Sequence, residues 1–168
     1  MLTLHTKLDH ADVIDDTLVL DYDRREKCRL RVTLASGAQA ALFMVRGSVL
    51  RDGDLLTGPD NRVVRVQAAL EPTYAIRCAD ALTLVRCAYH LGNRHTPIAI
   101  TAGLLRIRVD QVLREMVERL GGVVTEEDAP FEPEPGAYSG GGHHHGERNA
   151  LLAPVPLRQK IHRPGDAP

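Results

Sequence analysis

The residues best suited to chemistry in this sequence are histidines. The chain has eight of them, and His143, His144 and His145 are consecutive and flanked by glycines. Neutral imidazole binds nickel, copper and zinc, and histidine-rich tracts commonly hold these metals. We favour a native metal tract over an expression tag, because residues 146–168 follow it.

A further candidate ligand is His95, in the run 89–97 (Tyr-His-Leu-Gly-Asn-Arg-His-Thr-Pro). Gly92 is expected to end a helix there, and Pro97 favours extended backbone at the residue before it. His95 is therefore expected on a loop directly after a helix. The simpler alternative is a surface histidine with no metal. His90 and His95 do not fit the HExxH zinc motif, because no glutamate lies between them.

Ligand number constrains how such a metal would be held. A divalent transition metal takes about four to six donors, so His95 alone cannot satisfy it. A two-fold dimer would bring two copies of His95 together, and the tail histidines could supply further ligands. Such an open site suits loading and unloading. Such a site would hold nickel well but copper better, so the ligands alone leave nickel, zinc and copper open.

Composition argues against several other classes of protein. The 21 basic and 22 acidic side chains give a net charge of -1, which disfavours a general nucleic-acid binder. No apolar run approaches the roughly 18 residues of a membrane span, and no signal peptide is evident, so a cytoplasmic protein is expected. The three cysteines form no CxxC pair, and no hydrolase or nucleotide-binding motif occurs. We therefore expect no enzyme activity.

The elements that would position these histidines fall into two parts. Residues 1–70 are expected to form an all-β domain, with Val- and Leu-rich runs separated by Gly, Asp and Asn turns. Those runs lie at 17–20, 28–34, 40–45 and 62–66. Pro72 argues against strand pairing at that point, and the domain boundary is placed nearby.

Residues 71–138 are expected to form a ferredoxin-like domain with the order βαββαβ, so the fold class is α+β. Asp80 and Asp110 are good N-caps for helices at 81–91 and 111–120. Strands are predicted at 74–78, 97–100, 104–108 and 123–125. From Glu126 the composition becomes acidic and rich in proline, which predicts a non-globular segment leading into a disordered, His-containing tail at 139–168.

The run 89–97 resembles a motif of the UreE family of urease accessory proteins. The segment 131–138 (Phe-Glu-Pro-Glu-Pro-Gly-Ala-Tyr) resembles the family's acidic Pro-Gly-Ala-Tyr segment, and a histidine-bearing tail follows, as in many members. The resemblance implies a β domain similar to a peptide-binding module, then a ferredoxin-like metal domain. It also implies a cytoplasmic homodimer with His95 at the interface.

The function implied by this resemblance is that of a nickel metallochaperone. Nickel would pass through the urease GTPase accessory protein to the urease apoprotein assembly complex, with no nucleic-acid or membrane partner. Some members carry extra histidines before the second helix, where this chain has Val109, Asp110 and Gln111, so no auxiliary site is expected. Two alternatives stay open: a general nickel or zinc buffering protein, and a peptide-binding assembly factor without metal transfer.

Overall fold

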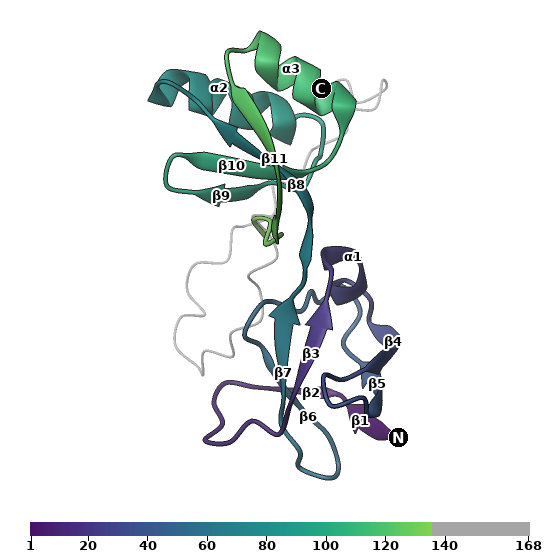
Figure 1. The fold of residues 1–168 in the computed structure, drawn as a ribbon. Coiled ribbons are helices and arrows are strands. Elements are labelled where there is room, and N and C mark those ends of the chain that lie inside the picture. Colours follow the sequence, from purple (N-terminus) through teal and green to yellow (C-terminus); the bar gives the residue numbers. More distant parts are fainter. Residues whose placement is uncertain (136–168) are drawn as a thin grey trace, which may run out of the picture. The chain divides into compact units, whose positions relative to one another are not determined.

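The computed structural model describes residues 1–135 (Figure 1). The expected tail at 139–168, with His143, His144 and His145, lies outside the described residues. Within residues 1–135, no helix is both long and apolar enough to cross a membrane.

The N-terminal part contains two sheets and one short helix. One sheet has the order β1-β5-β4 and the other the order β2-β6-β7-β3. Leucine and valine side chains, including Leu4, Leu18 and Leu42, form a buried core among these strands. The elements are β1 (Leu2–Leu4), β2 (Thr6–Leu8), β3 (Asp16–Leu20), α1 (Tyr22–Arg25), β4 (Arg29–Thr33), β5 (Gln39–Phe43), β6 (Leu55–Thr57) and β7 (Val64–Ala68).

The C-terminal part confirms the predicted βαββαβ order. Its sheet has the order β11-β8-β10-β9 with antiparallel pairing throughout, and α2 and α3 lie over one face of it (Figure 1). Leu91 of α2 and Val117 of α3 are fully buried against Ile76 and Ile107 of the sheet. The elements are β8 (Leu70–Arg77), α2 (Ala81–Gly92), β9 (Ala99–Thr101), β10 (Leu104–Arg108), α3 (Gln111–Arg119) and β11 (Val123–Pro130).

The caps expected from sequence fix where both helices begin. The Asp80 carboxylate accepts a hydrogen bond from the backbone N–H of Thr83 (2.9 Å), and Asp110 accepts one from Leu113 (2.9 Å). Each cap satisfies an N–H group that the first helical turn leaves without a partner. Bonding from the Thr83 backbone and hydroxyl holds the pKa of Asp80 below its usual value, so the carboxylate stays ionised.

Two expectations about the strands were wrong. Pro72 lies inside β8, opposite Asp128 of β11. β10 pairs with β8 only as far as Thr73, so β8 has one open edge at Pro72, and proline is tolerated at such an edge. The non-globular segment predicted from Glu126 is also wrong as far as Pro130, because β11 runs to that residue.

Candidate metal centre

His95 lies on the turn that follows α2, as the sequence predicted. The turn closes through hydrogen bonds from the Arg94 N–H to the Leu91 carbonyl (3.1 Å) and from the His95 N–H to the Gly92 carbonyl (2.9 Å). Gly92 itself is the last residue of α2 and is not left-handed, which corrects the expected role of that glycine. His95 takes the left-handed conformation instead, with φ of 55°.

A left-handed backbone is uncommon for a residue with a Cβ atom. Among residues 1–135 only Asn61 and His95 adopt it without being glycine. Such a conformation costs free energy and persists where the surrounding structure imposes it, often at functional sites. The turn therefore fixes the direction in which the His95 imidazole leaves the backbone.

The His95 side chain is exposed beside an open groove of about 430 Å³. Arg108, on the groove wall, forms an ion pair with Asp23 (2.6 Å), and Asp110 is engaged as the α3 cap. The imidazole thus stays accessible to ligands from outside this part of the chain. The groove is lined by Pro72, His95, Thr96, Pro97, Arg108, Val109, Asp110 and Leu113.

No complete metal site exists within residues 1–135, where no three histidine, cysteine or acidic side chains converge. His90 lines a different hollow, together with Arg94 and Met116, and its ring lies edge-to-face with that of Tyr89 at 5.4 Å. The two histidines of the run 89–97 are therefore not brought together. Each copy of the described chain supplies one imidazole, that of His95, at this groove.

The cysteines do not complete this site. Burial raises the pKa of the Cys87 thiol to about 11, and the nearby Cys78 thiol, with its sulfur 3.9 Å away, adds to the shift. Metals bind the thiolate form, which this environment disfavours. The Cys87 side chain is fully buried in the core between α2 and the sheet.

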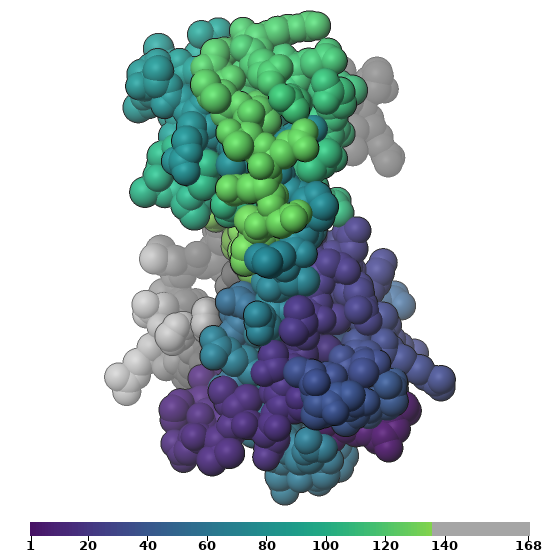
Figure 2. All heavy atoms as spheres, in the orientation of Figure 1, coloured from purple at the N-terminus to yellow at the C-terminus, as the bar shows by residue number. Residues whose placement is uncertain are grey.

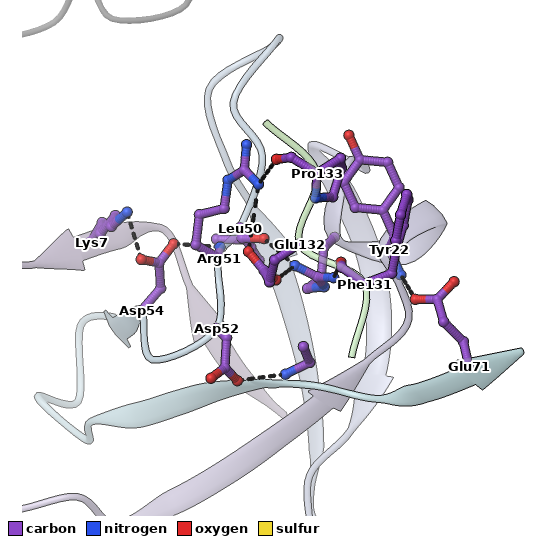
Figure 3. Close-up of polar contacts among 12 residues, drawn as sticks. Lys7, Tyr22, Leu50, Arg51, Asp52, Asp54, Glu71, Phe131, Glu132 and Pro133 are labelled. Carbon is purple, nitrogen blue, oxygen red and sulfur yellow. Dashed lines mark hydrogen bonds and ion pairs between the residues drawn. The ribbon is translucent and has the colours of Figure 1, made fainter. Parts of the chain in front are cut away.

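The segment after β11 is anchored by contacts that the sequence did not predict (Figure 3). Phe131 is fully buried, and its ring lies edge-to-face with that of Tyr22 at 5.4 Å. Glu132 forms ion pairs with Arg25 and Arg51, and Arg25 also donates to the carbonyls of Leu50 and Phe131. Phe131, an aromatic residue within an acidic run, was the one signal for this anchoring.

The anchored segment also contacts the strand region next to His95. The Glu134 N–H donates a hydrogen bond to the Ile98 carbonyl (2.8 Å). Ile98 is three residues after His95 in the chain. The end of the described chain is therefore bonded to a residue that closely follows the His95 turn.

Comparison with known proteins agrees with this architecture. The model of the UreE N-terminal domain matches residues 2–69, and the model of the UreE C-terminal domain matches residues 71–154. Together these matches cover most of the chain, and they meet where β7 gives way to β8.

Relatives called urease accessory protein UreE align with the chain at high identity. The Nitrosospira multiformis protein is 55% identical over 100% of this chain and 99% of its own length. The Janthinobacterium sp. (strain Marseille) protein is 60% identical over 99% of this chain and 98% of its own length. The Burkholderia thailandensis protein is 50% identical over 86% of this chain and 68% of its own length. The chain belongs to the UreE family of urease accessory proteins.

Proposed function

We propose that this protein is a nickel metallochaperone, which binds nickel through His95 and delivers it to apo-urease. In this proposal the urease GTPase accessory protein takes part in the transfer, and the protein acts in the cytoplasm without catalysing a reaction of its own. Family membership supports the link to urease assembly. The exposed imidazole on a fixed turn supports His95 as the primary ligand.

The observation that carries the proposal is the hydrogen bond between Glu134 and Ile98. An extended chain advances at most about 3.3–3.6 Å per residue. Nine residues separate Glu134 from His143, which allows a reach of about 30 Å. Ile98 is three residues from His95, or at most about 11 Å by the same measure. In this proposal the two copies of His95 hold the central nickel, and the chain length after Glu134 permits the tail histidines to add further ligands.

A homodimer would supply the second His95. Exposed apolar side chains support such a contact: Val109 is on the groove wall, and Val112, on the first turn of α3, lines the hollow beside His90. Burial of apolar surface is the main drive for association, and two-fold symmetry would place the same groups from both copies together. Two copies of His95, with tail histidines added, reach the ligand number that nickel takes.

Imidazole ligands give nickel no absolute preference over zinc or copper, since copper binds such sites more tightly. Delivery to the right client must then come from metal supply and from the partner protein. Delivery of metal to a client distinguishes a metallochaperone from the two alternatives. A buffering protein holds metal without a client, and an assembly factor acts on partners without metal.

Urease activation with purified components tests the proposal. Nickel-loaded protein is mixed with apo-urease, the GTPase accessory protein and GTP, and ammonia release is measured at limiting nickel. We expect His95→Ala to lose most of the activation, while the matched control His90→Ala, another exposed histidine of the same run, keeps it. Activation no better than that from a nickel chelate at equal free nickel would indicate a buffer. Full activation by His95→Ala would favour an assembly factor without metal transfer.

A further inference from the structure

A basic stretch of the N-terminal part carries exposed arginines that the proposed metal chemistry does not use. Between residues 27 and 51 the sequence has no acidic side chain, although the whole chain has a net charge of -1. This stretch includes β4 and β5, and its residues, dark blue in Figure 2, occupy an open part of the surface. Its basic residues are Lys27, Arg29, Arg31, Arg46 and Arg51.

Two of these arginines lie side by side on an exposed face of β4. Side chains alternate along the strand, so Val32 is buried while Arg29 and Arg31 are exposed. None of the ion pairs within residues 1–135 involves Arg29 or Arg31. The Cα atoms of Arg29 and Arg31 are about 6.6 Å apart along the strand, since each residue advances about 3.3 Å.

The backbone beside these arginines is also available. β4 is the outermost strand of the β1-β5-β4 sheet, and no strand of the described chain pairs with its other edge (Figure 1). An edge strand presents unpaired N–H and C=O groups that can hydrogen-bond to an added strand. Charged residues at an edge normally deter pairing with a second copy of the same edge. An acidic strand, in contrast, would be attracted by the two arginines.

Apolar side chains adjoin the charged face. Phe43 of β5 lies directly opposite Arg29 in the strand register and is 48% exposed, and Val45 is 79% exposed. Residues opposite each other in an antiparallel pair share a face of the sheet. The face thus combines an aromatic ring with two arginines, a combination enriched at protein interfaces.

We propose that β4 is a docking edge for an extended acidic peptide segment of a partner protein, which adds to the sheet as a fourth strand. Carboxylates at alternate positions of the peptide would face Arg29 and Arg31, because the two-residue period of a strand matches their spacing. Charge-assisted contacts give the recognition and backbone hydrogen bonds give the alignment. The inference concerns partner binding by the N-terminal part and does not rest on nickel binding at His95.

Fluorescence polarisation with the full-length protein and labelled synthetic peptides tests this docking edge. The probe is a ten-residue peptide with glutamate and valine in alternation. One comparison peptide has the same composition with its glutamates consecutive, and another is N-methylated at alternate backbone amides. We expect the alternating peptide to bind, and both comparison peptides to bind at least about tenfold more weakly, because they lose the charge register or the edge hydrogen bonds.

Charge reversal of the protein completes the test. The variant Arg29→Glu/Arg31→Glu should lose affinity for the glutamate peptide by about tenfold or more and gain affinity for a peptide with lysine in place of glutamate. The matched control Arg77→Glu/Arg86→Glu, on exposed positions of β8 and α2, should change neither. Equal binding of the N-methylated peptide, equal loss in the control, or binding of a single-stranded oligonucleotide but no peptide would overturn the proposal.

Discussion

The backbone N–H of Glu134 donates a hydrogen bond to the carbonyl oxygen of Ile98, with an N···O distance of 2.8 Å. This bond joins the segment after β11 to the residues that lead from His95 into β9. The neighbouring Phe131 and Glu132 are anchored by Tyr22, Arg25 and Arg51. The point from which the tail continues is therefore fixed near the candidate metal ligand.

The anchoring of this segment predicts a stability loss in Glu132→Ala. The Arg25 side chain is fully buried, and removal of Glu132 leaves its charge without the carboxylate partner. We expect the free energy of unfolding to fall by about 2–3 kcal/mol, the range for a lost hydrogen bond to a buried charge. Urea unfolding measures it. Glu134→Ala, at an exposed side chain two residues away, is the control and should change stability by less than about 0.5 kcal/mol. An equal loss of stability in both variants would contradict a stabilising role of the ion pair between Arg25 and Glu132.

The left-handed turn predicts an unusual ranking of substitutions at His95. Glycine adopts a φ of 55° without steric cost, whereas alanine keeps the Cβ clash. We expect His95→Gly to be more stable than His95→Ala by about 1 kcal/mol in thermal unfolding. At Asn93, where φ is -64°, the ranking should reverse, because glycine there gains nothing and loses more entropy. Equal stability of His95→Ala and His95→Gly would mean that the backbone of residue 95 is not left-handed in solution.

The proposed homodimer predicts that a charge on the exposed apolar surface of α3 disrupts association. Val112 is 67% exposed on α3, and Val112→Glu would place a carboxylate within the proposed interface. Sedimentation velocity should then show a monomer for Val112→Glu and a dimer for the unchanged protein. Val13→Glu, at a residue that is also 67% exposed but in an N-terminal loop, should leave the dimer intact. An unchanged protein that sediments as a single chain with and without nickel would exclude the shared site.

A buried carboxylate in the N-terminal part predicts a pH effect on stability. Hydrogen bonding from the Ser36 hydroxyl is the main cause that holds the pKa of Asp16 below its usual value, and the Thr17 N–H and Arg62 add to it. Because the folded-state pKa is lowered, this contribution is present above about pH 4, the usual aspartate range, and is lost as pH falls through the folded value.

The matching variant is Asp16→Asn, which removes the charge at every pH. We expect it to be less stable than the unchanged protein by about 1–3 kcal/mol at pH 7, and the gap to narrow steadily between pH 4 and pH 2. Urea unfolding across this range measures the gap. Asp60→Asn, at an exposed carboxylate, is the control. A gap that is constant down to pH 2 would mean that shape, and not charge, explains the effect.

The sequence predicted the helices and the order of elements in the C-terminal part well, because their signals are local. Asp80 and Asp110 mark helix starts by side-chain chemistry that acts within three residues. The position of His95 after a helix follows from the same local pattern. Short strands such as β1, β2 and β6, with three residues each, carry too little periodicity to be recognised.

What could not be predicted depends on contacts between distant residues. Glu126 and Glu127 sit in a strand because β8 offers them an edge, and they pair with Arg114 and Arg106. Local composition alone made this segment resemble an acidic tail. The same holds for Arg25, whose burial depends on Glu132, 107 residues later in the chain. The left-handed φ of His95 likewise comes from the turn as a whole.

The measurement that tests the central claim most directly is calorimetric titration of nickel into three proteins: the full chain, the chain ending at Gly142, and His95→Ala. The account predicts that the shortened chain binds fewer ions than the full chain and keeps one nickel per dimer, since two copies of His95 stay on their fixed turns. His95→Ala should lose that central ion while its fold and dimer persist, because an exposed turn side chain contributes little to the core. Loss of all nickel binding in the shortened chain, together with unchanged binding by His95→Ala, would contradict the account.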